Sequence, residues 1–199
     1  MNKSLIFILT IGVFSIINTE MGVVGILPLV SENYGVTVSA AGLLVSMFAL
    51  VVAVSGPTMP LLFSGINRKK AMILVLSVFT LCNAVSAFAA NFPVVLAARV
   101  IPAFFQPVYV SMAMSVAGAS VPEKEAPKAV SKVMMGVSAG MVLGVPIVSY
   151  ISNMTSLRVG MLFFAGVNAA ALIATIFAVP DLPVKEKLSY GTQLSVLKE

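Results

Sequence analysis

The sequence predicts an all-α integral membrane protein with six transmembrane helices, and three observations lead to this fold class. Of its 199 residues, 59% are hydrophobic and only 10% charged, with a mean hydropathy of +1.07. An average soluble domain carries about 25% charged residues, so the composition argues against a soluble enzyme. High hydrophobicity also excludes an ordinary disordered chain. Finally, the apolar residues form six long runs, and short clusters of positive residues separate several of them.

Each of the six runs is long enough to cross a bilayer, whose hydrocarbon core of about 30 Å needs roughly 20 mostly apolar residues. The first run is too long for the apolar core of a signal peptide, so we expect it to be a retained helix. After the sixth run the chain becomes polar, and we expect 180–199 to be a cytoplasmic linker, the start of a central loop, rather than an interfacial helix. The expected spans are 5–30, 40–63, 71–90, 94–119, 133–151 and 159–179.

The basic residues between the spans predict the orientation of the chain. With six spans, ten Lys and Arg residues fall on one side of the membrane and only Arg158 falls on the other. Positive residues mark cytoplasmic loops, so we expect both termini in the cytoplasm. The ten are Lys3, Arg68, Lys69, Lys70, Lys124, Lys128, Lys132, Lys185, Lys187 and Lys198.

Glu20 is the only acidic residue within any of the six spans. A charged group near a helix centre costs about 2.5 to 3.5 kcal/mol, so such groups are rare and usually functional. Counting back from Val30 places Glu20 about 15 Å below the outer surface. It either pairs with a base for packing or binds a proton or cation beside a water-filled path. Because the chain has no His, Glu20 is our candidate for proton coupling.

Arg99 is the expected counterpart of Glu20, because it lies about 9 Å deep in the fourth span. If the first and fourth spans are neighbours, its permanent charge would favour the ionised carboxylate. A movement that separates the two side chains would then raise the affinity for a proton. The alternative is a salt bridge that only locks two helices together.

Three amides also lie at membrane depth: Asn83, Gln106 and Asn168. Hydrogen bonds between helices would account for each of them.

Gln106 has a second interpretation, because Pro102 and Pro107 flank it and proline leaves a helix carbonyl without its donor. An amide, free carbonyls and nearby aromatic rings suit an amphipathic small molecule. The residues that we expect in a substrate cavity are Gln106, Tyr109, Phe105 and Asn168.

The fifth span carries Gly136, Gly140 and Gly144 at a spacing of four, followed by Pro146. This repeat makes a smooth face on which another helix can pack closely. The second span also ends with glycine and proline, at Ser55–Pro57. Glycine and proline at corresponding places in two groups of three helices favour a 3+3 inverted repeat.

No motif for catalysis, metal binding or nucleotide binding is present. The lone Cys82 lies in an apolar run and cannot form an intrachain disulfide. We therefore expect no enzyme activity, no cofactor, no metal site and no nucleic-acid partner.

Several stretches resemble the major facilitator superfamily, and within it the drug/metabolite:proton antiporter branch. The stretch 143–146 of the fifth span, with Gly140 before it, is similar to the antiporter motif of that branch. Bacterial sugar, arabinose and purine efflux permeases are similar to the chain as a whole. The residues that carry the resemblance are Thr19-Glu20-Met21, Gly25 to Pro28, Ala40 to Ser46, Arg68-Lys69-Lys70, Arg99, Leu143 to Pro146 and Arg158.

The chain also departs from the family pattern in the loop between the second and third spans. Pro60, Ser64, Gly65 and Asn67 stand where the family has glycine, aspartate, arginine and glycine. The missing aspartate weakens the charge relay that the resemblance implies for Arg68 and Lys69.

The resemblance implies one six-helix half of a twelve-helix, proton-coupled exporter in the bacterial cytoplasmic membrane. Glu20 and Arg99 would couple protons, and Gly140, Gly144 and Pro146 would form a bendable contact. The expected partners are lipid, a small-molecule substrate, protons and a second half, from the same gene or a homodimer. An uncoupled facilitator, a non-transporting scaffold and a remnant are the alternatives, and an intramembrane enzyme is a more distant one.

Overall fold

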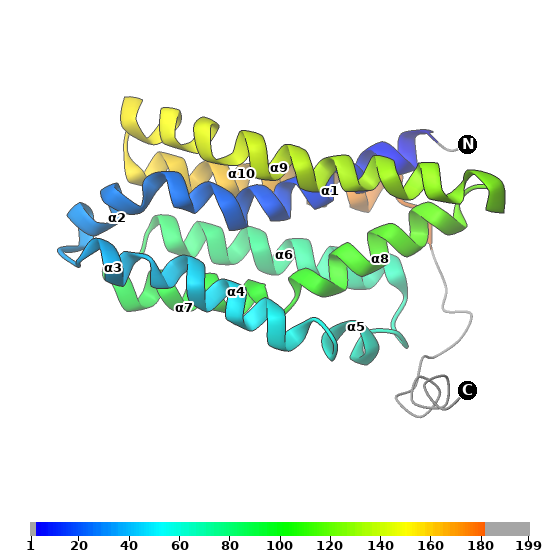
Figure 1. Ribbon diagram of the computed structural model, residues 1–199, viewed down its shortest axis with the longest axis horizontal. Coiled ribbons are helices and arrows are strands. Elements are labelled where there is room, and N and C mark those ends of the chain that lie inside the picture. The colour runs from blue at the N-terminus through cyan, green and yellow to red at the C-terminus, as the bar shows by residue number, and fades with distance from the viewer. Residues whose placement is uncertain (1–2, 182–199) are drawn as a thin grey trace.

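The computed structural model describes residues 3–181 as a bundle of nearly parallel helical rods, with no strand in that range (Figure 1). Six helical stretches are long and apolar enough to cross a membrane. The α-helices are α1 (Lys3–Gly22), α2 (Leu27–Tyr34), α3 (Val38–Ala41), α4 (Leu43–Ser55), α5 (Met59–Leu62), α6 (Arg68–Ala87), α7 (Phe92–Ala103), α8 (Gln106–Ala119), α9 (Ala126–Met154) and α10 (Leu157–Ala178). Two 3-10 helices are η1 (Val23–Ile26) and η2 (Glu123–Glu125).

The first span is one helical rod, Ser4–Tyr34, in which η1 separates α1 from α2. Pro28, near the start of α2, has no N–H, so it cannot bond the carbonyl one turn earlier. A short 3-10 stretch tightens the rod at this place, and such stretches often mark hinges. Glu20 lies just before it.

Glycine and proline interrupt the second and fourth spans. α4 ends at Ser55, and the turn that follows, with Gly56 and Pro57, leads to the short α5. The fourth span bends between α7, which contains Pro102, and α8, which begins at Gln106. The apolar run 40–63 therefore contains the end of α3 together with α4 and α5, and the run 94–119 contains most of α7 and all of α8.

Polar side chains cap the starts of three long helices. Asn67, Asn91 and Ser156 accept hydrogen bonds from the backbone N–H groups of α6, α7 and α10, at 3.3, 3.1 and 3.3 Å. Each cap satisfies a backbone donor that has no partner within the helix. The caps lie in the short turns that separate consecutive spans and thus help to set where each helix begins.

α1 is the central helix, packing mainly against α9 and also against α10 and α8, while α6 packs against α10 and α7. The α1–α9 contact is close because glycine lines it. A Cβ on Gly136 would collide with the Thr10 carbonyl, and one on Gly140 would lie 2.8 Å from the Cβ of Ile17. The glycine repeat of the fifth span therefore meets the first span.

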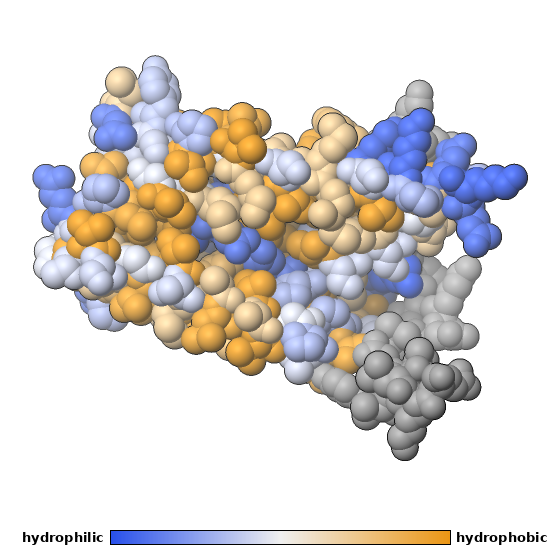
Figure 2. Space-filling view, viewed as in Figure 1, coloured by the Kyte–Doolittle hydropathy of each residue, from blue (hydrophilic) through white to orange (hydrophobic). Residues whose placement is uncertain are grey.

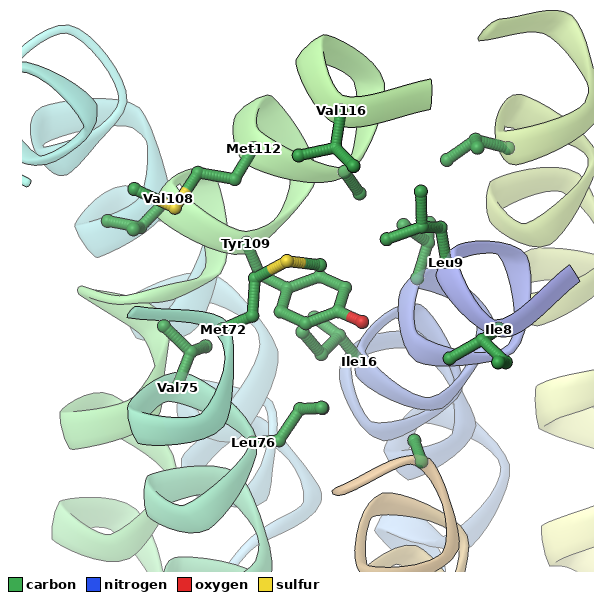
Figure 3. Packing of buried hydrophobic residues seen from close by; sticks show 14 of the residues in the cluster. Ile8, Leu9, Ile16, Met72, Val75, Leu76, Val108, Tyr109, Met112 and Val116 are labelled. Atoms are coloured by element: carbon green, nitrogen blue, oxygen red, sulfur yellow. The ribbon is translucent and has the colours of Figure 1, made fainter. Parts of the chain in front are cut away.

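The main hydrophobic core lies between α1, α6 and α8 (Figure 3). The Tyr109 ring points from α8 toward α1, next to Met72 and Ile16. Its hydroxyl reaches Gly12, where no Cβ would fit. A second core cluster at the other end of the bundle includes Val30, Leu44 and Phe164.

Most of the basic residues in the described loops lie at one end of the bundle. The start of α1, the α5–α6 connection and the α8–α9 connection lie at one end, and the α9–α10 turn lies at the other (Figure 1). The first end is strongly hydrophilic in Figure 2. The last described residue, Asp181, lies at the same end, where it accepts a 2.6 Å hydrogen bond from Asn67. Lys185, Lys187, Lys198 and nearly all of the linker expected at 180–199 fall outside the described residues.

Candidate functional site

The Glu20 carboxylate lies in the interior of the bundle and is half-buried. Gln106 Nε2, from the start of α8, donates a 2.7 Å hydrogen bond to Glu20 Oε2. The break between α7 and α8 places this amide opposite α1. Figure 2 shows hydrophilic side chains at mid-length of the otherwise apolar face, between the levels of α1 and α4. The first and fourth spans thus meet at a carboxylate that is neither fully exposed nor sealed in the core.

Arg99 reaches the same place but binds the backbone instead of the carboxylate. Its Nη2 donates to the carbonyl oxygens of Thr19 at 2.9 Å and of Glu20 at 3.3 Å. Its Nε donates to the Leu44 carbonyl at 3.5 Å, and its guanidinium lies 5.4 Å from the centre of the Phe48 ring. Arg99 therefore links α7 to α1 and α4 while only 4% exposed.

The salt bridge that the sequence left open as the alternative role of Arg99 does not form in the described part of the chain. The guanidinium donates to main-chain oxygens, while the Glu20 carboxylate accepts from Gln106. α1 keeps its α-helical pattern through Gly22, and the α-helical donor of the Glu20 carbonyl, the N–H of residue 24, lies inside η1.

Thr19 is the centre of a buried polar cluster on the adjoining side of α1. Its Oγ1 accepts from Asn168 Nδ2 of α10 at 2.8 Å and from Asn83 Nδ2 of α6 at 3.3 Å. The same hydroxyl donates to the Ser15 carbonyl at 3.0 Å. Asn168 also donates to the Phe164 carbonyl at 2.8 Å. We call Thr19, Asn83 and Asn168 the threonine cluster.

The structure brings some of the expected cavity residues together and keeps others apart. Gln106 contacts Glu20 directly. Phe105 packs edge-on against Phe63 of the α5–α6 connection, with ring centres 6.0 Å apart. Tyr109 and Asn168 are fully buried, Tyr109 in the core and Asn168 in the threonine cluster.

The other residues expected to serve conformational change lie away from Glu20. Gly140 and Gly144 are buried against α1, whereas Pro146 is exposed on the far face of α9. Arg68 and Lys69 open α6 at the end that carries both Asn67 and Asp181. The two glycines therefore serve helix packing, and Arg68 and Lys69 belong to the loop region at the end of the bundle.

Sequence reasoning missed the hydrogen bonds that converge on Thr19 and missed the buried Asn18 entirely. Neither amide atom of Asn18 has a hydrogen-bond partner in the described structure, and its Oδ1 lies 3.1 Å from the position of a Cβ on Gly144. The signal that could have pointed to Thr19 is its spacing of four from Ser15. This spacing places two small polar residues on one face of an apolar helix.

A carboxylate bound by an amide is chemically able to take up a proton or a cation. The site contains one carboxylate, one buried guanidinium and several amides. Among the residues that the structure describes, no group of three His, Cys, Asp or Glu side chains could hold a metal ion.

Comparison with known proteins agrees with this architecture. The family model described as Major Facilitator Superfamily matches residues 9–198. The inner membrane transport protein YdhP of Escherichia coli is 30% identical over 95% of this chain and 49% of its own length. A chloramphenicol efflux pump of Mycobacterium tuberculosis is 30% identical over 89% of this chain and 43% of its own length.

Among solved structures, the peptide transporter POT in complex with sulfate has the same fold. Its TM-score is 0.78 at 14% identity, and the match covers 98% of this chain and 42% of that one. The chain thus spans about half the length of the curated relatives and of the transporter structure that it matches.

Proposed function

The chain belongs to the Major Facilitator Superfamily, and from this premise we propose that it forms one six-helix half of a proton-coupled membrane exporter. The observation that carries the proposal is the Glu20 carboxylate, held inside the bundle by Gln106 and next to backbone bound by Arg99. A carboxylate at this depth is costly, and its retention is typical of an ion or proton pathway.

Proton coupling follows from the way in which Glu20 is held. The ionised carboxylate accepts the hydrogen bond from Gln106, so it is favoured while α1 and α8 stay together. If the two helices separate, the carboxylate loses this donor and is more readily protonated. A conformational change at the fourth span would thereby be linked to proton uptake or release.

A second six-helix half would supply the other wall of the transport path. The relatives that match are about twice as long as this chain, which supports a partner of similar size. Alternating access would then rock the two halves about a site between them. The positively charged end would face the cytoplasm, as the distribution of basic residues predicts.

We propose small, amphipathic molecules as substrates, on two grounds. The surroundings of Glu20 combine one carboxylate, one guanidinium that is bound to backbone, one amide and apolar helix faces, which suits a solute with few charges. One matching relative carries chloramphenicol efflux in its name. Chloramphenicol is therefore the first probe to try.

The test is pH-driven efflux in proteoliposomes that contain the chain, alone and with the second half of YdhP. Glu20→Gln should abolish the dependence of chloramphenicol flux on an imposed pH gradient. Glu32→Gln is the matched control, because that carboxylate is exposed at the end of α2. Retained pH-driven flux in the Glu20 variant would contradict the proposal.

Two other outcomes would identify the alternatives. Flux that ignores the pH gradient in the wild-type chain would indicate an uncoupled facilitator. The absence of flux under both conditions would indicate a non-transporting scaffold or remnant.

A further inference from the structure

We propose that the threonine cluster is a positioning device that sets the place of the Glu20 carboxyl group. The inference rests on the proposed function of Glu20 and assigns roles to Thr19, Asn83 and Asn168. The hydrogen bonds of the cluster go to Thr19 and not to the carboxylate, and Asn168, which the sequence assigned to a substrate cavity, is one of its members. The three residues act through the backbone of α1.

Two helices, α6 and α10, hold the Thr19 side chain from one side. Asn83 comes from α6 and Asn168 from α10, and these two helices pack along much of their length. Both amides converge on a single hydroxyl oxygen. Thr19 is 1% exposed, and the two amides are 3% and 0% exposed. Hydrogen bonds at such depth have no competing water, so they hold α1 against the seam between α6 and α10.

Glu20 directly follows Thr19 in the chain, so a fixed Thr19 also fixes the backbone of Glu20. Arg99 binds the carbonyl oxygens of both Thr19 and Glu20 from the side of α7. Gln106 binds the Glu20 carboxylate from α8. Four helices therefore contact two consecutive residues of α1, immediately before the rod changes to 3-10 geometry.

This arrangement fixes the carboxylate just before the change from α-helical to 3-10 geometry. η1 begins three residues after Glu20, and the α-helical pattern of hydrogen bonds changes there. Without the threonine cluster, the last turn of α1 could rotate or unwind into η1. The carboxylate would then leave the 2.7 Å hydrogen bond with Gln106.

Asn83 and Asn168 are not equivalent in this device. Asn168 keeps a 2.8 Å bond to the Phe164 carbonyl when Thr19 loses its hydroxyl, whereas the donor bond recorded for Asn83 goes to Thr19. Thr19→Val alone therefore leaves the Asn83 amide without an acceptor. The double variant Thr19→Val/Asn83→Leu replaces both partners by apolar groups, which can be nearly neutral for stability. The double variant therefore separates a loss of position from a loss of stability.

The experiment is infrared spectroscopy of the reconstituted full chain at one fixed pH. The carboxyl band of Glu20 is identified as the band that Glu20→Gln removes, so the measurement needs no transport. Thr19→Val/Asn83→Leu should shift this band, because the hydrogen bond from Gln106 weakens. Thr19→Ser, which keeps the hydroxyl, should leave the band in place.

Thr80→Val is the matched control for the loss of a threonine hydroxyl. Thr80 lies on α6 close to Asn83, and its hydroxyl donates to the Leu76 carbonyl within its own helix, at 2.8 Å. An unshifted band in a folded double variant would overturn the proposal. So would failure of the double variant to fold, because the cluster would then be a packing device. Loss of proton coupling in Glu20→Gln tests the proposed function separately, since it is read from flux and not from this band.

Discussion

Arg99 shows at the scale of one residue why a buried cation can be tolerated without a carboxylate partner. Its guanidinium donates to three backbone carbonyls and lies over the Phe48 ring. The planar fork of arginine spreads its N–H donors over a wider span than the clustered donors of an ammonium group, so it can reach acceptors on different helices. Hydrogen bonds that involve a charged group contribute about 1.5 to 3 kcal/mol.

Arg99→Lys should therefore destabilise the bundle although it preserves the charge. We expect the free energy of unfolding to fall by about 2 kcal/mol or more, because a lysine cannot reproduce the contacts on two helices. Thermal unfolding in detergent measures the effect. Phe48→Leu is the comparison, with an expected loss of about 1 kcal/mol through the ring contact. Equal stability of the lysine variant and the wild type would contradict this role.

Gln106→Leu should weaken proton coupling without removing the carboxylate. The lost hydrogen bond to Glu20 corresponds to about a tenfold or larger change in an equilibrium constant. We expect the midpoint of the pH profile of chloramphenicol flux to shift. Gln106→Glu, which has nearly the same size but lacks the amide donor, should shift it as well. A pH profile like that of the wild type in both variants would show that Gln106 does not tune Glu20.

Charge and depth drew attention to Glu20 and Arg99, and the flanking prolines to Gln106, and the structure places the three close together. The hydrogen bond from Gln106 to Glu20 was not predicted, and the partners of Arg99 are backbone carbonyls of α1 and α4. A sequence pattern shows side chains, but Arg99 binds main-chain atoms.

At the scale of helices, the close packing of α1 on α9 depends on the absence of side chains from one face of α9. Gly136, Gly140 and Gly144 occupy that face one turn apart, and each lies within van der Waals reach of α1. In lipid there is little hydrophobic drive between helices, so close backbone approach is a main source of association. The spacing of four predicted such a face, although it could not say which helix would pack there.

Gly136→Ala should separate α1 from α9, because the added methyl group would meet the Thr10 carbonyl, which belongs to the backbone and cannot rotate away. We expect a loss of about 2 kcal/mol in unfolding free energy. Gly166→Ala on α10 is the control, since no atom lies within 4 Å of the new methyl group. Helix propensity alone predicts that this control gains up to about 1 kcal/mol. Chemical unfolding of both variants measures these free energies. Equal changes in the free energy of unfolding for the two variants would contradict a packing role for Gly136.

At the scale of the whole molecule, hydropathy alone predicted the all-α class and the number of spanning stretches. It did not predict how the runs 40–63 and 94–119 divide, because the division depends on where glycine and proline change the backbone path. Nor could it place Tyr109 and Asn168 in buried clusters, since both are polar residues that a cavity or a helix interface would accept equally. Both side chains are buried because α8 and α10 pack against α1, and the sequence does not show which helices will pack there.

Sidedness is a property of the whole bundle, and a membrane-impermeant maleimide can test it in intact cells. Cys82 is first replaced by alanine, so that each variant carries one thiol. Glu123→Cys lies at the basic end of the bundle, and Asn153→Cys lies at the other end, both at exposed positions. The positive-inside rule predicts that the thiol at 153 reacts in intact cells, whereas the thiol at 123 reacts only after permeabilisation. The reverse labelling pattern would mean that the basic end faces outward, so the proton gradient would act on Glu20 from the opposite side.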